Sequence, residues 1–442
     1  MEPEFDFFKH WYPLSPIEDI DPQQPTPITL LGLRLVIWKS GSSDRFRVFL
    51  DQCPHRLAPL SEGRVDEKTG NLMCSYHGWQ FDDQGICTHI PQAEKSQLVA
   101  KNRENFCVTS LPCRQEQDLL WVWPDSESAE LAKETPLPLS PLIDASKGYV
   151  WSSMVRDLEY DWQTLIENVA DPSHVPFTHH GVQGNRDLAK PIDISIVDSS
   201  GNLIKAKTDS RFGTTITFEP PCHLEYDIQF GASGKKIGLV TYCLPVSPGK
   251  SRLVALFPRN FAIKLHHIVP RWWDHITNRN LVLDGDMIIL HQQESFLHQE
   301  SEKSWQIKYK MPTSADRLVI EFRKWFDKYC QGKLPWHKVG LEPATITQIN
   351  ESRHQLLDRY EQHTKHCRSC REALRNAQFL QKFLLALFAV IVAIVALLPD
   401  QLHLRLGLPL IGLGFVGLGV YAWLKFWLEP RFLFVDYVHS QK

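Results

Sequence analysis

The N-terminal part of the chain alternates short apolar runs with turn-forming residues. The runs at 33–40, 46–53 and 119–125 are rich in β-branched and aromatic residues, and Gly, Pro and Asp stand between them. Runs of this length and composition, bounded by turn residues, are typical of β-strands. We therefore predict that residues 8–145 form a small all-β domain.

Residues 146–345 show a mixture of strand-like and helix-like patterns. This mixture predicts an α+β domain. The predicted helices lie at 158–170, 280–300 and 314–330, and the predicted strands lie at 192–198, 214–220 and 251–258.

The C-terminal part contains two uncharged apolar runs, at 383–398 and 406–424. As helices they would be about 24 and 28 Å long, close to the bilayer hydrocarbon thickness of about 30 Å. A buried core helix is the alternative for either run alone. Two runs joined by a short loop favour a transmembrane helical hairpin, which we place at 383–428. The polar, helix-compatible residues 346–382 would then be a helical connector.

The charges around the apolar runs predict an orientation. Basic residues precede the first run and follow the second, whereas the loop between them contains only Arg405. Because basic flanks stay on the cytoplasmic side of a membrane, both ends of the hairpin are expected there. The catalytic domains are therefore predicted on the cytoplasmic or stromal side of a thylakoid, plasma or inner-envelope membrane. The acidic first six residues are not typical of a signal or transit peptide.

The overall composition excludes some classes of function. A net charge of −3 over 442 residues gives no basic surface for nucleic acid, so no nucleic-acid partner is expected. Ten cysteines in so long a chain, some of them close to histidines, indicate metal or redox chemistry rather than a disulfide framework.

The first candidate metal site is formed by Cys53, His55, Cys74 and His77. The pattern is C-x-H, then eighteen residues, then C-x-x-H. Two thiolates and two imidazoles are the ligands of a Rieske-type [2Fe–2S] cluster, and the imidazoles raise its reduction potential. A Cys₂His₂ zinc site is the alternative. Zinc sites seldom use C-x-H as one half, so the spacing favours the Rieske cluster.

The second candidate metal site begins with His174 and His179, which follow a predicted helix that ends at Asp171-Pro172. A mononuclear Fe(II) oxygenase site needs two histidines and one carboxylate, with open positions for O₂. We predict Asp286 as the carboxylate, with Asp284 as the alternative. A histidine pair alone is more often a surface or core feature. After a Rieske motif an iron site is favoured, because the cluster delivers the single electrons that such a site consumes.

A late group of cysteines and histidines has helical spacing. His363, His366, Cys367 and Cys370 would share one face of a helix. They could bind a metal, form a regulatory disulfide or have no chemical role.

The order C-P-H-R, C-x-Y-H-G-W and D-x-x-H-x₄-H resembles the Rieske non-haem iron oxygenases over residues 8–345. The segments HWYPLSPIEDID and CPHRLAPLSEGR, the late C-x-x-C and the C-terminal apolar pair are similar to the pheophorbide a oxygenase and lethal leaf spot protein branch. Plant members carry transit peptides, whereas this chain begins almost at the Rieske motif, as we expect of a cyanobacterial homologue.

The resemblance implies a helix-grip-like catalytic domain and a head-to-tail homotrimer. In this arrangement Asp171 bridges the mononuclear iron and the cluster of the neighbouring subunit. It also implies ferredoxin as the electron donor, O₂ as co-substrate and a tetrapyrrole substrate, with thiol-linked redox control at Cys367 and Cys370. The chain shows no flavin or NAD(P) domain, which agrees with an external donor.

Our hypothesis is a membrane-bound Rieske oxygenase that uses O₂ and ferredoxin-derived electrons to oxidise a chlorophyll-derived tetrapyrrole such as pheophorbide a. The alternative is a Rieske redox component of a membrane translocation or electron-transfer complex, without oxygenase turnover.

Overall fold

The computed structural model describes residues 5–93, 103–209, 213–299, 304–343 and 351–441. Its N-terminal part forms three antiparallel sheets, with the strand orders β1–β11–β10, β2–β3–β4–β9 and β5–β6–β7–β8. This part is β-rich, as predicted, although the short helix Ala129–Glu134 also lies within residues 8–145. The strands are β1 (Tyr12–Pro16), β2 (Thr26–Leu30), β3 (Leu33–Lys39), β4 (Phe46–Leu50), β5 (Arg64–Val65), β6 (Leu72–Met73), β7 (Gln80–Phe81), β8 (Cys87–His89), β9 (Ser110–Leu111), β10 (Cys113–Glu116) and β11 (Leu119–Val122).

The middle of the chain folds around one seven-stranded antiparallel sheet, in the order β12–β18–β17–β16–β15–β14–β13. In β14, buried Ile204 and Ala206 alternate with more accessible lysines, because successive side chains of a strand point to opposite faces. The strands are β12 (Ser153–Leu158), β13 (Ile194–Ser199), β14 (Ile204–Thr208), β15 (Gly213–Glu219), β16 (His223–Gln229), β17 (Lys236–Ser247) and β18 (Lys250–Leu256).

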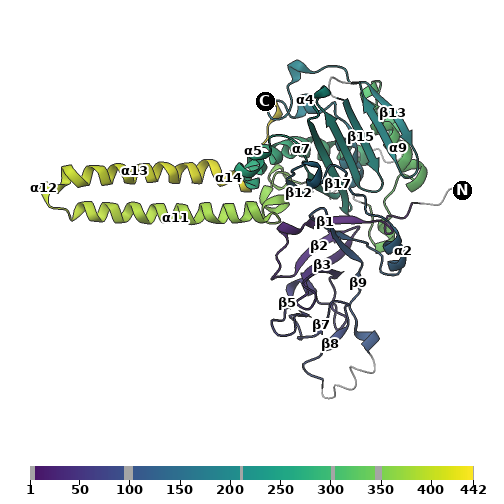
Figure 1. The fold of residues 1–442 in the computed structure, drawn as a ribbon, viewed down its shortest axis with the longest axis horizontal. Helices are drawn as coiled ribbons and strands as arrows, with labels where there is room; N and C mark the ends of the chain where they lie inside the picture. The colour runs from purple at the N-terminus through teal and green to yellow at the C-terminus, as the bar shows by residue number, and fades with distance from the viewer. Residues whose placement is uncertain (1–4, 94–102, 210–212, 300–303, 344–350, 442) are drawn as a thin grey trace.

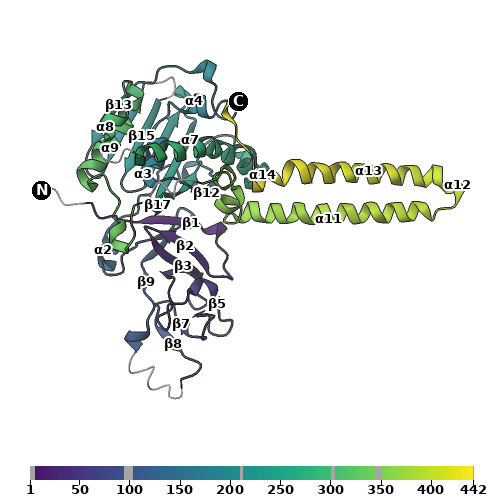
Figure 2. The same cartoon turned by 180° about the vertical axis from the view of Figure 1, so that it is seen from behind.

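Helices cover one face of this sheet, and Figure 2 shows α3, α7 and α9 in front of the strands. The ring of Phe218 on β15 packs edge-on against Phe322 and Trp325 of α9, with centroids 5.5 and 5.7 Å apart. The predicted helix at 158–170 starts only at Trp162, because Leu158 is the last residue of β12 and residues 159–161 form a bend between the strand and the helix. The helices are α2 (Ala129–Glu134), α3 (Trp162–Ala170), α4 (Val175–Thr178), α5 (Ile263–Ile268), α6 (Arg271–Asp274), α7 (Asn280–Gln299), α8 (Trp305–Lys308) and α9 (Arg317–Cys330).

The C-terminal part is a helical hairpin that projects from the body, with α11 and α13 side by side (Figure 1). Each arm is long and apolar enough to cross a bilayer, and only 11% of its most apolar stretch is buried by the rest of the chain. The elements are α10 (Arg353–Leu356), the π-helical turn η11 (Tyr360–Thr364), α11 (Arg368–Ala396), α12 (Asp400–Leu402), α13 (Leu408–Trp423) and α14 (Pro430–Leu433). The fold class predicted from the sequence is confirmed.

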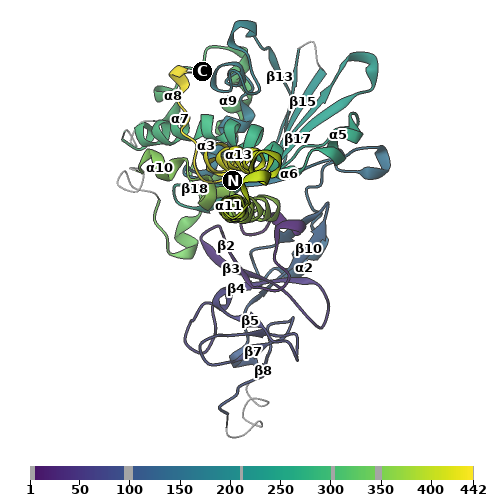
Figure 3. The ribbon, with the colours of Figure 1, turned by 90° about the vertical axis from the view of Figure 1, so that its left-hand side faces the viewer.

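Seen along the hairpin in Figure 3, the seven-stranded sheet and its helices lie on one side of the hairpin base, and the three small sheets lie on the other. The expected limit between catalytic domain and connector, at 345 and 346, falls within 344–350, outside the described residues. The expected limit between connector and hairpin, at 382 and 383, falls inside α11, which runs through it without a break.

Candidate active site and metal centres

The four predicted cluster residues lie on two loops with the same backbone structure. In each loop the amide of the cysteine, Cys53 or Cys74, donates to the carbonyl five residues further on. The amide of the fourth residue after each cysteine, Leu57 or Gly78, donates back to the carbonyl of that cysteine. The two hydrogen bonds in each loop all measure 2.8–3.0 Å. Leu57 and Gly78, at this fourth position, both have a positive φ, of 60° and 70°. The chain therefore builds the same turn twice, with one cysteine and one histidine on each.

The side chains on these loops are arranged with the sulfur atoms inside and the imidazoles outside. Cys53 and Cys74 are buried, whereas the rings of His55 and His77 are partly exposed and have centroids 4.4 Å apart. His55 stacks on Trp79 at 4.7 Å. Its Nδ1 is buried and has no hydrogen-bond partner in the described part of the chain. An orphaned ring nitrogen of this kind fits a metal ligand.

The donor set fits a two-iron cluster better than a single zinc ion. Burial, with a smaller contribution from nearby Cys74, raises the pKa of Cys53 to about 11, so holding two thiolates here requires a cation. Two other groups of described residues have all their donor atoms within 4.8 Å of one another, as one ion requires, but these four do not. The residues present therefore fit a Rieske [2Fe–2S] cluster.

The second predicted site is brought together by a very short helix. His174 immediately precedes α4 and His179 immediately follows it, and their Nε2 atoms lie 3.2 Å apart. The carboxylate of Asp286, on α7, lies 3.8 Å from the first Nε2 and 3.5 Å from the second. Bonds of about 2.1 Å at right angles would place ligand atoms about 3.0 Å apart, so small side-chain shifts complete a two-histidine, one-carboxylate iron site.

The alternative carboxylate, Asp284, is engaged elsewhere. Its Oδ1 accepts from Arg156 at 2.8 Å and its Oδ2 accepts from Arg359 at 2.6 Å, and all three side chains are fully buried. Residues two apart on a helix point about 200° apart around its axis, so only one of the two aspartates can face the histidines. The structure brings Asp286 to them.

Two further residues support this site, and sequence reasoning did not identify them. The side chain of Asn168, on α3, lies beside Asp286 and lowers the pKa of that carboxyl group. Gly285 lies between the two aspartates, and a Cβ there would stand 3.2 Å from the carbonyl oxygen of Thr178 and 3.3 Å from Nδ1 of His179. A glycine lets α7 approach the histidine loop this closely. In the sequence, the only sign of this close approach was that Gly285 interrupts a helical pattern, where glycine is unfavourable.

The electrostatics of the site agree with a role in cation binding. Burial raises the pKa of Asp286 to about 7, although His174 opposes the shift. Burial, with a smaller contribution from His174, lowers the pKa of His179 to about 3. The pocket thus presents the neutral imidazole of His179 beside a carboxylate whose charge is costly to bury unless a cation accompanies it.

Asp171 lies directly behind His174, one of the candidate iron ligands. Its backbone carbonyl accepts a 2.5 Å hydrogen bond from Nδ1 of His174, and its Oδ2 lies 3.8 Å from the same nitrogen. Its Oδ1 accepts from the backbone amide and hydroxyl of Ser173, at 2.7 and 2.5 Å. These contacts fix the ring so that Nε2 faces Asp286, which is how groups behind a ligand usually orient a metal-binding histidine.

A cavity of about 600 Å³ opens onto the three candidate iron ligands. Most of its wall is aliphatic or aromatic, and Arg279 is the one lysine or arginine among the lining residues that the structure describes. The guanidinium of Arg279 stacks over Phe257 at 3.5 Å, and its Nε donates to Asp274 at 2.8 Å. The apolar wall residues include Met154, Val169, Ile228, Leu239, Leu253 and Phe257.

Comparison with known proteins identifies the family. A model of the Rieske [2Fe-2S] domain matches residues 10–112, and a model of pheophorbide a oxygenase matches residues 218–304. Over 457 residues the chain is 38% identical to the chloroplastic pheophorbide a oxygenase of Oryza sativa subsp. japonica, covering 98% of this chain and 84% of that protein. The chain belongs to the pheophorbide a oxygenase family of Rieske oxygenases.

Other members and neighbours agree with this assignment. The chain is 32% identical to the protochlorophyllide-dependent translocon component 52 of Arabidopsis thaliana, over 82% of this chain and 72% of that protein. The solved structure of NdmA from Pseudomonas putida CBB5 has the same fold, with a TM-score of 0.57, 22% identity and coverage of 79% of this chain and 95% of that one. From its family, its fold and its candidate metal groups, we conclude that the present chain is an oxygenase. Its cofactors are a [2Fe–2S] cluster and a mononuclear iron.

The late cysteine pair of this Rieske oxygenase differs from its predicted arrangement. His363 lies in η11 and α11 begins only at Arg368, so the segment is not one continuous helix. The expectation of one shared face is wrong for His366, whose Nε2 lies 3.4 Å from Asp157. Cys367 and Cys370 do lie beside His363, but their fourth neighbour is His275, which the sequence analysis did not identify.

Proposed function

We propose that this Rieske oxygenase oxidises a chlorophyll-derived tetrapyrrole, with pheophorbide a as the favoured substrate. The observation that carries the proposal is the apolar cavity of about 600 Å³ that opens onto His174, His179 and Asp286. Its volume is in the range of pockets for compact organic ligands, about 300–1,000 Å³. The relative with 38% identity over nearly the whole chain, a pheophorbide a oxygenase by name, supports this class of substrate.

In this proposal residues 8–145 carry the cluster and residues 146–345 carry the iron. Cys53, His55, Cys74 and His77 hold the [2Fe–2S] cluster, and His174, His179 and Asp286 hold the iron. When bound, the cluster supplies single electrons and the iron supplies O₂ activation at positions that the three protein ligands leave open. The apolar wall excludes water from the reacting face of the substrate. Arg279 provides a charge that can orient a substrate carboxylate.

We also propose a head-to-tail homotrimer in which Asp171 links the iron to the cluster of the next subunit. Within one chain the strands that flank the cluster loops, β5 and β7, lie at the opposite end of the body from α4 (Figure 1). Electron transfer between the two centres of one chain would therefore have to cross the whole body. A ring of three heterologous contacts removes this separation and closes without free ends.

The electron donor in this proposal is a ferredoxin. The sheets of the described residues are all antiparallel, so they lack the parallel β-α-β unit on which dinucleotides bind. An external one-electron donor fits that architecture.

We propose that the hairpin of α11 and α13 anchors the enzyme in a thylakoid, plasma or inner-envelope membrane. Apolar side chains along both helices, such as Phe383 and Phe415, are exposed. Basic residues near the base, including Arg371 and Lys425, favour a cytoplasmic or stromal position for the catalytic domains. The relatives from plants carry chloroplastic in their names, which agrees with such a membrane.

The proposal is tested with the His174→Ala variant and, as a matched control, His180→Ala. His180 is the next residue after His179, but its Nδ1 accepts from the amide of Arg186 and does not join the iron group. The wild type should contain about three Fe per chain and consume O₂ with pheophorbide a and reduced ferredoxin. His174→Ala should contain about two Fe, keep the Rieske spectrum and lose turnover, whereas His180→Ala should resemble the wild type. Turnover retained by His174→Ala would contradict the proposal.

The second candidate function is that of a redox component of a translocation or electron-transfer complex. The similarity to a translocon component favours it. Wild-type enzyme with full iron content that consumes no O₂ with any chlorophyll derivative, yet co-purifies with a membrane channel, would support this alternative.

A further inference from the structure

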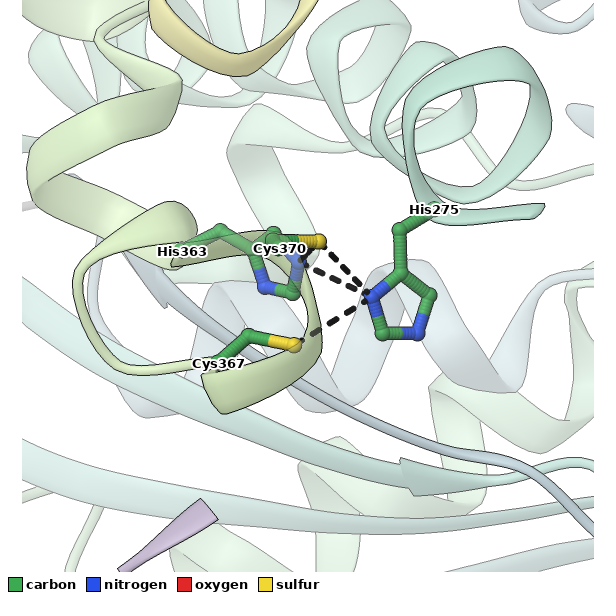
Figure 4. Close-up of side chains that lie close together, drawn as sticks. All are labelled: His275, His363, Cys367 and Cys370. Carbon is green, nitrogen blue, oxygen red and sulfur yellow. Dashed lines mark hydrogen bonds between the residues drawn. The ribbon is translucent and has the colours of Figure 1, made fainter. Parts of the chain in front are cut away.

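Four buried metal-binding side chains meet at the base of the hairpin, away from both iron centres. They come from three separate segments: His275 from the π-helical turn η7 (His275–Arg279), His363 from η11, and Cys367 and Cys370 from the start of α11. Figure 4 shows the two sulfur atoms and the two rings converging on one point. All four side chains are at most 2% exposed, and their donor atoms all lie within 4.8 Å of one another.

The outer nitrogens of both imidazoles are fixed by carbonyls of β12. Nε2 of His275 lies 3.0 Å from the carbonyl oxygen of Ser153, and Nδ1 of His363 lies 2.6 Å from that of Val155. A carbonyl can only accept, so each of these ring nitrogens carries the proton. When both rings are neutral, their inner nitrogens therefore carry lone pairs, and these two nitrogens lie 3.0 Å apart. Two facing lone pairs in a buried site need a cation between them.

The separations of the donor atoms match a tetrahedral zinc site. Zinc bonds of about 2.05 Å to nitrogen and about 2.3 Å to sulfur place two nitrogens about 3.3 Å apart and a nitrogen and a sulfur about 3.6 Å apart. Here the inner nitrogens are 3.0 Å apart. Sγ of Cys370 lies 3.3 Å from His363 and 3.5 Å from His275, and Sγ of Cys367 lies 3.7 Å from His275. No large side-chain movement is needed for all four atoms to bind one ion.

We propose that His275, His363, Cys367 and Cys370 form a structural zinc site that fastens the hairpin to the catalytic domain. Four protein ligands in a closed, buried set leave no open position for a substrate, which is typical of structural rather than catalytic zinc. Zn²⁺ with two thiolates and two neutral imidazoles has no net charge, so the complete site can be buried. The two cysteines release their protons to solvent when the ion binds.

The surroundings of the site agree with a thiolate ligand and with a fastening role. Nη2 of Arg271 donates to Sγ of Cys367 at 3.4 Å, and the same guanidinium is paired with Asp19 and Glu18. The amide of Arg368 donates to Asp19 at 2.8 Å. The ligands and these neighbours thus connect the first turn of α11 with η7, β12 and the 3-10 turn Ile17–Asp19 that follows β1.

The test is metal analysis of the full-length holoenzyme, purified without chelators from cells supplied with iron and zinc. We expect about one zinc in addition to about three Fe per chain. X-ray absorption at the zinc edge of the wild type should show two sulfur and two nitrogen neighbours. The enzyme must contain its full iron, because zinc bound in an iron-depleted Rieske site would also have two sulfur and two nitrogen neighbours. This measurement needs no variant, so it stays decisive if a variant fails to fold.

Variants locate the zinc in the chain. Cys370→Ser and His275→Gln should reduce zinc to background while iron content and the Rieske spectrum stay unchanged. The matched controls are His366→Gln, in the same segment but paired with Asp157, and Cys243→Ser, equally buried in β17. Both controls should keep their zinc.

Three results would overturn the proposal. The first is wild-type enzyme with full iron but no zinc. The second is zinc that persists undiminished in both ligand variants. The third is a Cys367–Cys370 disulfide found by mass spectrometry in the enzyme as isolated. None of these results bears on the oxygenase proposal, which depends on turnover and on the iron bound by His174.

Discussion

Asp284 and Asp286 lie two residues apart on α7 and serve opposite sides of the helix. Asp286 faces His174 and His179, whereas Asp284 is clamped between the guanidinium groups of Arg156 and Arg359. One short acidic sequence thus supplies both the proposed carboxylate ligand of the iron and the centre of a buried ion network.

This division predicts opposite outcomes for two matched variants. Asp286→Asn should lose the mononuclear iron and turnover but keep nearly the wild-type melting temperature. Asp284→Asn should keep the iron ligands but leave two buried arginines without their counter-ion, lowering the free energy of unfolding by about 3–5 kcal/mol. Iron content and thermal unfolding in detergent measure both effects. Loss of iron without loss of stability in Asp284→Asn would reverse our assignment.

Asp171→Asn should separate metal binding from electron transfer. The iron ligands remain, and the backbone carbonyl of residue 171 still accepts from His174, so iron content should stay at about three per chain. Loss of the carboxylate should slow turnover about 10- to 100-fold. Stopped-flow oxidation of the reduced cluster by O₂ and substrate measures the step directly. The control is Ser173→Ala, which removes only one hydrogen bond to the carboxylate. Equal rates of cluster oxidation in Asp171→Asn and the wild type would argue against the bridging role.

Arg279→Met should weaken recognition of an acidic substrate. Asp274 and Phe257 hold the guanidinium at the cavity wall, and its terminal nitrogens have no hydrogen-bond partner among the described residues. We expect KM for pheophorbide a to rise about tenfold, equivalent to about 1.4 kcal/mol, with little change in kcat. The methyl ester, which lacks the carboxylate, should show no such difference between wild type and variant. An equal rise in KM for pheophorbide a and for its methyl ester would indicate a structural role for Arg279 instead.

Glu294 should make stability depend on pH. Burial, with a smaller contribution from the neighbouring Asp161, raises its pKa from 4.5 to about 10. The folded chain therefore holds a proton that the unfolded chain releases above pH 4.5. This contribution is fully present below pH 4.5 and is lost as the pH rises towards about 10. The free energy of unfolding should fall by at most about 1.4 kcal/mol per pH unit in this window. Glu294→Gln should flatten the decline in melting temperature between pH 6 and 8, and an unchanged slope would exclude Glu294 as its source.

The sequence by itself determined the features that depend on local spacing. Cys53, His55, Cys74 and His77 are recognisable because each half of the cluster motif is one short turn, and the structure builds the same turn twice. His174 and His179 are recognisable because one short helix sets their separation. The apolar runs at 383–398 and 406–424 predicted the hairpin because helix length follows directly from residue number.

Only the tertiary structure decided which distant residues complete each site. The choice of Asp286 over Asp284 depends on how α7 is rotated against α4, and that rotation is set by the buried arginines and by the close approach at Gly285. His275 joins Cys367 and Cys370 from a turn about ninety residues earlier in the chain, whereas nearby His366 turns away to Asp157. Sequence spacing fixes which side chains share a turn, but packing between segments fixes which turns meet.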